Sequence, residues 1–331
     1  MFSRHLRAAV LAAVLAAVLG TTGIVASAPP ASAQQYPSQT ITFVVAFAPG
    51  GIADSAARIF ADKVGARLGG ANVVIENRGG AAGNLGAKLV AGAAADGHTI
   101  LVSSTAVAIN DSLHKSKGYE TADLKPVAIP ASAPEALAIH PNNPAKNMAE
   151  FLQAAKGKGV TFGSAGVGSP SYIQAQYFFQ ILAKVETVHV PFAGGAPAIN
   201  ALIGNHVQAV ASTLPTVGSA INQGVLRGLA IASPNRIAVV PSAPTYTEGG
   251  FPNFYAYGWV GFFVPAKTSD AIVNRLNAAI SDVLKMPEVQ ERLKTIGFEP
   301  RTSGLAETTA FFKGEIDHWG KMVRTIGASI Q

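Results

Sequence analysis

The chain has 331 residues, a formal net charge of +6, 49% hydrophobic residues and no cysteine. The lack of cysteine excludes a small disulfide-stapled fold, and a chain of this length can instead bury a conventional apolar interior in two domains. The basic residues are scattered rather than interleaved with aromatic residues, which argues against nucleic acid binding.

The first 33 residues have the pattern of a secretory signal peptide. Arg4 and Arg7 form a basic start, Ala8–Leu19 is an apolar run too short to span a bilayer, and residues 31–33 read Ala-Ser-Ala, a cleavage site. We therefore predict cleavage after Ala33 and a mature chain that begins at Gln34 with a net charge of +4. With no cysteine after the signal there is no lipid anchor, which favours a periplasmic protein that is not inserted in the membrane.

The stretch Phe43–Arg58 organises the first part of the chain. Phe43–Phe47 is a β-branched and aromatic run typical of a buried strand, and the sequence Pro49-Gly50-Gly51 ends it. A helical apolar pattern follows at once and ends at residues 69–70, two glycines. A strand, a glycine turn and a helix start can hold an anion on free backbone N–H groups. The same arrangement also occurs in turns that bind nothing, and this stretch alone leaves both interpretations open.

The same pattern of strand, Gly/Ser loop and helix recurs along the chain. Ser169 and Pro170 are typical of the N-cap and first position of a helix. This alternation predicts a mainly parallel α/β sheet. The further strands are expected at residues 73–75, 99–102, 128–140, 160–163, 187–190, 208–212 and 226–232. One helix is expected to follow the glycine loop of residues 76–86 and to continue to about Ala94, and others are expected at 171–182 and 198–203.

The last part of the chain is predicted to return to the first domain. A strand is expected over residues 259–264, followed by three helices whose apolar stripes face the core, the last of them with Phe311, Phe312 and Trp319. A chain that leaves one domain near residue 138 and returns near 259 crosses twice, which indicates a hinge. We predict domain I over residues 34–137 plus 259–331 and domain II over residues 138–258.

A series of short motifs resembles one known family. They are Ala48-Pro49-Gly50-Gly51 with Asp54 and Arg58, Glu76-Asn77-Arg78, Gly83-Asn84-Leu85-Gly86, Asp96-Gly97-His98-Thr99, Ser164-Ala165-Gly166 with Gly168-Ser169, Val190-Pro191-Phe192 with Gly194-Gly195, and Pro244-Thr245 with Glu248. The series, which covers Tyr36–Gln331, is similar to the Bug family (TctC), the solute receptors of tripartite tricarboxylate transporters. The resemblance implies a type II periplasmic binding-protein fold that closes over a small carboxylate. It also implies delivery to the membrane permease subunits of such a transporter, by a monomer without cofactor.

The resemblance further implies a ligand held between the domains by backbone amides, hydroxyl groups and water. Asp54 has two interpretations, since it could orient a water molecule or simply stabilise the first turn of its helix. The implied binding residues are Pro49, Gly50, Gly51, Ala53, Asp54, Asn84, Ser104, Ser164, Ala165, Gly166, Gly168, Ser169, Phe192 and Thr213.

The sequence departs from the family pattern at three places. Phe192 stands where a tyrosine is usual, which removes a hydroxyl group. Ser212-Thr213 stands where many members carry an acidic residue, and its absence favours a plain carboxylate over a ligand with an amino group. Ser171-Tyr172 replaces a usual His-Leu, and Tyr172 could either line the pocket or have a structural role.

Motifs of enzymes are absent or incomplete. Phe162–Gly166 misses the hydrolase motif G-x-S-x-G by one position, and the seven histidines show no metal-binding spacing. No dinucleotide or Walker motif is present. We therefore predict a non-catalytic receptor without metal or cofactor; the alternatives are a ligand-sensing periplasmic partner of a signalling system and, with less support, a secreted hydrolase.

Overall fold

The computed structural model describes residues 36–330. The predicted signal peptide and the predicted mature start at Gln34 lie outside these residues. Residues 39–330 form one compact unit. Within the described part of the chain, every helix is too short or too polar to cross a membrane.

The first elements of this unit alternate between strand and helix. They are β1 (Ile41–Val45), α2 (Ile52–Arg67), β2 (Val73–Asn77), η1 (Ala81–Gly83), α3 (Asn84–Ala91), β3 (Thr99–Ser104) and α4 (Ala106–Leu113). β1 lies in the middle and pairs in parallel with β2 and β3. It is buried on both faces, which explains its continuous apolar sequence. The predicted strand, glycine turn and helix are confirmed, although β1 already ends at Val45; α4 was not predicted.

A second set of alternating elements follows. They are α5 (Met148–Ala155), β5 (Val160–Ser164), α6 (Pro170–Tyr177), η3 (Phe178–Ala183), β6 (Thr187–Pro191), α7 (Gly195–Ile203), β7 (Ala209–Thr213), α8 (Leu214–Asn222) and β8 (Arg227–Ile231). β5 pairs in parallel with β6 and β7. The predicted cap is confirmed, since Ser169 is the N-cap of α6 and Pro170 its first residue. The helix predicted over 171–182 changes to a π-helix in η3.

Two strands connect the sets. β4 (Leu124–Ile139) pairs antiparallel with β9 (Tyr257–Pro265) over most of its length and with β7 and β8 at its end. β3 also pairs antiparallel with β9. The prediction of a mainly parallel sheet is therefore wrong at this place. A strand that carries the chain out and a strand that brings it back run in opposite directions, so the sheet is mixed, in the order β2-β1-β3-β9-β4-β7-β5-β6.

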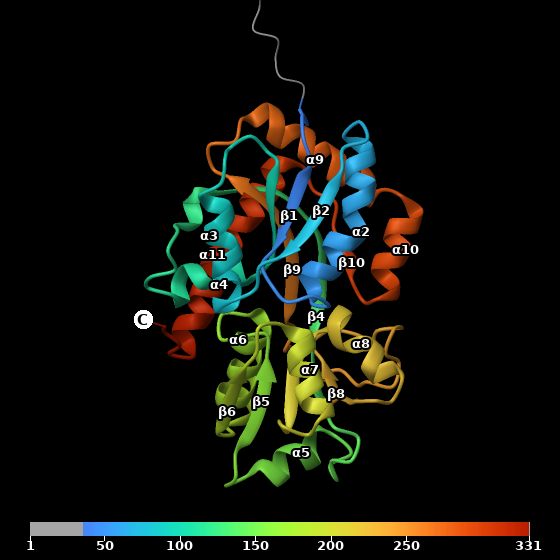
Figure 1. Cartoon of the computed structure of the whole chain (residues 1–331). Coiled ribbons are helices and arrows are strands. Elements are labelled where there is room, and N and C mark those ends of the chain that lie inside the picture. Colours follow the sequence, from blue (N-terminus) through green and yellow to red (C-terminus); the bar gives the residue numbers. More distant parts are fainter. Residues whose placement is uncertain (1–35, 331) are drawn as a thin grey trace, which may run out of the picture. The chain divides into compact units, whose positions relative to one another are not determined.

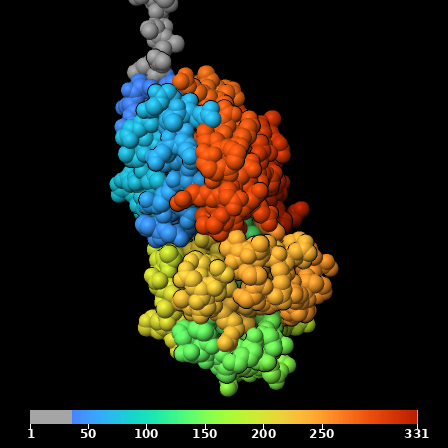
Figure 2. All heavy atoms as spheres, turned by 90° about the vertical axis from the view of Figure 1, so that its right-hand side faces the viewer, coloured from blue at the N-terminus to red at the C-terminus, as the bar shows by residue number. Residues whose placement is uncertain are grey.

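We call lobe A the part built on β1, β2, β3 and β9, and lobe B the part built on β5, β6, β7 and β8; β4 runs through both (Figure 1). Lobe A also contains η2 (Thr121–Asp123), which precedes β4. The part of the chain after β9 completes the lobe with α9 (Asp270–Leu284), α10 (Pro287–Thr295), β10 (Glu299–Pro300) and α11 (Leu305–Thr325). Figure 2 shows segments from the two ends of the unit side by side, in blue and orange-red, and α2 contacts both α9 and α10.

The aromatic stripe of α11 faces the core of lobe A, as predicted. Phe312 and Trp319 are buried, while Phe311 is half-buried. One carboxylate oxygen of Glu315 accepts hydrogen bonds from the indole N–H groups of Trp259, at 2.7 Å, and Trp319, at 2.9 Å. The charge-assisted bond from Trp259 fixes α11 against the returning strand β9, and the bond from Trp319 holds the Glu315 carboxylate in place within α11.

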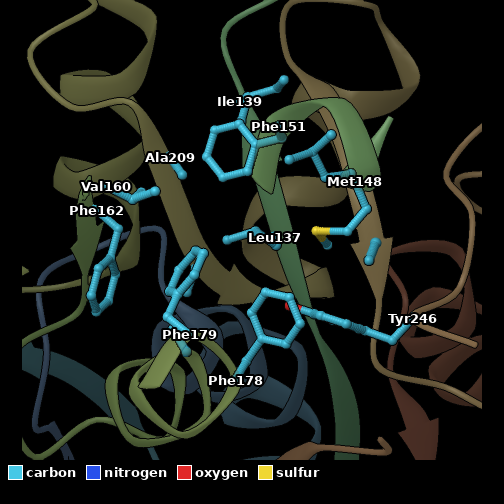
Figure 3. Packing of buried hydrophobic residues seen from close by; sticks show 14 of the residues in the cluster. Leu137, Ile139, Met148, Phe151, Val160, Phe162, Phe178, Phe179, Ala209 and Tyr246 are labelled. Atoms are coloured by element: carbon cyan, nitrogen blue, oxygen red, sulfur yellow. The ribbon is translucent and has the colours of Figure 1, made fainter. Parts of the chain in front are cut away.

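The core of lobe B is rich in aromatic residues. Figure 3 shows Phe162, Phe178, Phe179 and Tyr246 gathered with aliphatic side chains from the strands. Phe178 is fully buried, and its ring centroid lies 4.8 Å from that of Tyr246 in an edge-to-face arrangement. Such contacts add to the free energy of burial.

Replacing Phe178 with Ala should lower the free energy of unfolding by about 3–5 kcal/mol, because it opens a cavity between fixed aromatic rings. Denaturant unfolding of the purified variant measures the loss. Leu182→Ala is the matched control, since Leu182 is 37% exposed and its truncation should cost about 0.5 kcal/mol or less. Equal losses in the two variants would contradict the assignment of Phe178 to a rigid core.

Candidate functional site

A small cavity lies where the strands of both lobes end. Its lining residues are Phe47, Gly51, Ile52 and Ser104 from lobe A, with Ala165, Ser169, Pro170, Ser171, Gly195, Ser212, Thr213 and Thr216 from lobe B. These residues end or follow β1, β3, β5, β6 and β7, and the carboxyl ends of such strands are where open α/β sheets bind ligands. The cavity volume is about 30 Å³.

Five helices start at this cavity or beside it. The residues that mark these starts are Gly51 for α2, Thr105 (next to the lining Ser104) for α4, Ser169 for α6, Gly195 for α7 and Thr213 for α8. The first N–H groups of a helix have no intrahelical acceptor and carry the positive end of its dipole. Four of these starts also have no side-chain cap; α6 is the exception. The helix starts therefore favour a negatively charged group in the cavity.

The polar side chains of the lining are hydroxyl groups. The Ser169 hydroxyl donates to the Gly166 carbonyl oxygen at 2.7 Å and accepts from the Tyr172 N–H. The Thr213 and Thr216 hydroxyl oxygens lie 3.0 Å apart. The described lining contains no charged side chain. A ligand in the cavity would thus meet donors without a countercharge.

The predicted site residues fall into two groups. Those that line the cavity are Gly51, Ser104, Ala165, Ser169 and Thr213. Those that do not line it are Pro49, Gly50, Ala53, Asp54, Asn84, Ser164, Gly166, Gly168 and Phe192. The structure places most of the second group directly behind the lining or at the contact between the lobes.

Asp54 is bound within lobe A. Its carboxylate accepts from the Gly50 N–H at 2.9 Å, from the Arg58 guanidinium at 2.9 and 3.0 Å, and from the Asn77 amide. Burial alone would raise the pKa of this carboxyl, but these hydrogen bonds and the Arg58 charge together hold the pKa below its usual value. Asp54 thus fixes the Gly50 turn ahead of α2, which matches the structural interpretation.

Ser164 and His189 form a pair that has the composition of a catalytic dyad, in which Ser164 is buried and His189 is partly buried. The Ser164 hydroxyl lies 2.8 Å from His189 Nε2, and Ser164 is fully buried. Burial lowers the pKa of His189 to about 4, so the imidazole is neutral at physiological pH. Its ring packs against the rings of Phe162 and Tyr172, which stack on each other. The pair fixes the β5–β6 edge behind the cavity, and Tyr172 packs there rather than lining the cavity.

Asn84 and Phe192 support other residues. Asn84 accepts a hydrogen bond from the Asn110 side-chain amide at 3.0 Å, and the same amide group donates to the Ala82 carbonyl oxygen. The ring of Phe192 lies over Gly163, where an added β-carbon would come within 3.0 Å of it. Neither side chain reaches the cavity.

The lobes meet through small residues. The Ala48 N–H of lobe A donates to the Ala193 carbonyl oxygen of lobe B at 3.3 Å. A β-carbon on Gly50 would lie 3.3 Å from the Ala196 side chain, and one on Gly168 would lie 1.9 Å from Asn110 Oδ1. Close approach of the lobes therefore depends on glycine at these positions.

Several lining residues were not among the predicted ones: Phe47, Ile52, Pro170, Ser171, Gly195, Ser212 and Thr216. Thr216 lies in α8, a helix that was not predicted, although Pro215 in its first turn is a typical start signal. Ser171 follows the predicted N-cap Ser169 and could have been included from that position alone. The contribution of Phe47 depends on the fold of the turn after β1.

Two α/β lobes joined by extended strands, with an uncharged cavity of helix starts and hydroxyl groups, define a solute-binding protein. Solved structures of this class resemble the chain. The periplasmic binding protein BugD has a TM-score of 0.84 and 28% identity and covers 89% of this chain and 100% of its own. MatC from Rhodopseudomonas palustris, solved with malate, has a TM-score of 0.81 and 32% identity over 87% of this chain and 100% of its own. Another R. palustris protein, solved with adipate, has a TM-score of 0.84 and 28% identity over 89% of this chain and 99% of its own.

The sequence profile described as "Tripartite tricarboxylate transporter family receptor" matches residues 56–328. The chain belongs to this family, whose members include the Bug proteins, and the predicted periplasmic binding-protein fold is confirmed. The compared members are binding proteins rather than enzymes. The part of the chain that the structure describes has no group of acidic, histidine or cysteine side chains arranged to hold a metal ion.

Proposed function

We propose that the protein is a periplasmic receptor that captures a small organic carboxylate in the cavity between lobes A and B, for uptake by a tripartite tricarboxylate transporter. The observation that carries this proposal is the meeting of five helix starts at one uncharged cavity. A carboxylate placed there accepts hydrogen bonds from backbone N–H groups and from the hydroxyl groups of Ser104 and Thr213. The Ser169 hydroxyl instead donates to Gly166 and caps α6.

Capture involves separation and closure of the lobes. A cavity of about 30 Å³ is far smaller than the pockets of about 300–1,000 Å³ that usually hold small-molecule ligands. Ligand entry thus needs an open form, and the ligand stabilises a closed form whose walls adjust around it. We assign the hinge to the two crossings near residues 138 and 259, with domain I over residues 34–137 and 259–331 and domain II over residues 138–258.

The ligand class follows from charge and size. The lining offers donors but no acidic side chain for an ammonium group, which favours a plain di- or tricarboxylate or an aromatic acid over an amino acid. Malate and adipate, found in two similar structures, are of the first kind. Bridging water molecules in the cavity would let one site accept acids of different length.

The proposal also includes the location of the protein in the cell and its transport partner. A signal peptide at residues 1–33 would export the chain to the periplasm, where the mature monomer would deliver its ligand to the membrane permease subunits. The family to which the chain belongs is described by this transport role.

A thermal-shift screen of the mature protein, refolded to remove bound ligand, tests the proposal. The panel contains malate, adipate, citrate, benzoate and glutamate, with sugars as controls. A ligand at one hundred times its dissociation constant adds about 2.7 kcal/mol to the free energy of unfolding, which raises the melting temperature measurably. We expect shifts with one class of carboxylate and none with sugars. A folded protein that no acid shifts would contradict the proposal.

A further inference from the structure

Glu135 is a buried carboxyl group that the fold does not explain. It lies on β4 and is 4% exposed, and among the described residues neither of its carboxyl oxygens has a hydrogen-bond partner of normal geometry. Removing a carboxyl group from water without a partner is costly, so a purely structural position would be filled more favourably by an apolar residue. Such groups concentrate at functional sites.

The carboxyl group of Glu135 lies directly behind the cavity. Glu135 pairs with Thr213 across the antiparallel β4–β7 ladder, which brings the first atoms of the two side chains within about 5 Å of each other. A β-carbon built on Gly258 would lie 3.2 Å from Glu135 Oε1, 3.3 Å from the Thr213 methyl carbon and 3.5 Å from Pro170 Cγ. Thr213 and Pro170 both line the cavity, so one layer of side chains separates it from the carboxyl group.

The position is fixed by the backbone at the crossing between the lobes. The Glu135 N–H donates to the Ala256 carbonyl oxygen at 2.9 Å, and its carbonyl oxygen accepts from the Ala232 N–H at 2.8 Å. At this residue β4 ceases to pair with β9 and begins to pair with β7. These contacts fix the backbone of Glu135, and with it the face of the sheet from which its side chain extends.

Among the described residues, no cation contributes to favouring the ionised form of Glu135. Burial raises the pKa of its carboxyl to about 8, and the nearby Ser171 hydroxyl lowers it only in part. The segment after β8 contributes Tyr246, whose pKa is raised by burial and then by Glu135. The other neighbours of the carboxyl group described above are Thr213 of β7, Gly258 of β9 and Pro170 of α6. None of these residues has a titratable side chain. Glu135 is therefore neutral at pH 7.

We propose that the protonation state of Glu135 determines which charge the cavity accepts. Pro170, Ser171 and Thr213 form the wall between this carboxyl group and the cavity. When the carboxyl group is neutral an anion can bind in the cavity, and when it is ionised it repels that anion. The inference rests on the proposed carboxylate function. It adds that the protein binds the ligand only while Glu135 carries its proton. Glu135 does not touch the ligand. It acts across the wall residues, through the charge of its carboxyl group. Two negative charges at this separation in a poorly hydrated interior repel strongly.

The sign of the pH dependence follows from linkage. Below pH 8 Glu135 already carries its proton, and the affinity for a carboxylate is independent of this group. Above pH 8 the free protein loses the proton and must take it up again to bind, so the affinity falls by up to tenfold for each pH unit. A zwitterionic ligand whose ammonium group met the carboxylate would show the opposite sign.

The test is calorimetric titration of malate and of adipate into the mature protein between pH 6 and 9.5, for wild type and Glu135→Gln. The variant keeps the shape of the side chain but cannot ionise. We expect the wild-type affinity to fall above pH 8 and the variant affinity to stay constant. At pH 9, paired buffers of different ionisation enthalpy should show uptake of a proton by the wild type and none by the variant.

Each other outcome has a defined meaning. Identical pH profiles in wild type and Glu135→Gln, or an affinity that rises with pH, would overturn the role of Glu135 and leave the receptor function standing. If neither protein binds any acid of the panel at any pH while both remain folded, the proposed function fails and this inference fails with it.

Discussion

Replacing Ser169 with Asp should abolish carboxylate binding, with at least a 100-fold loss of affinity. Ser169 is 1% exposed and lines the cavity at the start of α6. Asp is as good an N-cap as Ser, so the helix should keep its start. Its carboxylate, however, would occupy the positive end of the helix and repel the ligand from the same N–H groups. Calorimetric titration with the acid found by the thermal-shift screen measures the loss.

Two control variants isolate the charge. Ser169→Asn has the shape of Asp without its charge and should keep most of the affinity. Ser269→Asp makes the same change at another serine N-cap, that of α9, which does not line the cavity; it should bind as the wild type does. If Ser169→Asp binds as tightly as Ser169→Asn, the ligand is not held at the start of α6.

Replacing Gly168 with Ala should lower ligand affinity at least tenfold by preventing closure. The new β-carbon would lie 1.9 Å from Asn110 Oδ1 and 2.9 Å from the Ala82 side chain, both in lobe A. Asn110 cannot swing aside, because its amide group is bound to Ala82 and Asn84. The clash exists only where the lobes meet, so the open form is unaffected. Calorimetry measures the affinity, and small-angle X-ray scattering with ligand measures whether the protein still becomes more compact.

Gly314→Ala is the matched control, since a β-carbon there meets no atom within 4 Å; its affinity should not change. Shortening the opposing side chain gives a second check. In the double variant Gly168→Ala with Asn110→Ala, part of the lost affinity should return, because the nearest clashing atom is gone. A single Gly168→Ala variant that binds and compacts like the wild type would rule out contact between these residues in the closed form.

Those parts of the site that depend on residues adjacent in the chain could be predicted from the sequence. The glycine turn after β1 and the Ser169-Pro170 start of α6 are readable because an N-cap, a glycine turn and an apolar period lie within a few positions of one another. The same local patterns identify nearly all the strands, with bounds that differ by a few residues.

The parts that sequence reasoning missed depend on contacts between distant segments. Ser164 and Asn84 were expected to reach the ligand, but His189 and Asn110 hold their side chains inside the lobes. Glu135 stands in an apolar strand pattern, and its importance arises only where Thr213, Pro170 and Gly258 come together. The antiparallel direction of β9 likewise follows from the path of the chain between the lobes and not from the residues of the strand.

The helix starts at the cavity affect how mutations can change the ligand specificity of such a receptor. The N–H groups of a helix start belong to the main chain, and among ordinary substitutions only proline removes one. Ser171, Ser212 and Thr216 can therefore vary in size and polarity while the anchor for one carboxylate stays in place. Selectivity for the rest of the ligand is thus separable from the ability to bind a carboxylate. New specificities can arise by exchange of a few side chains while the backbone of the site stays the same.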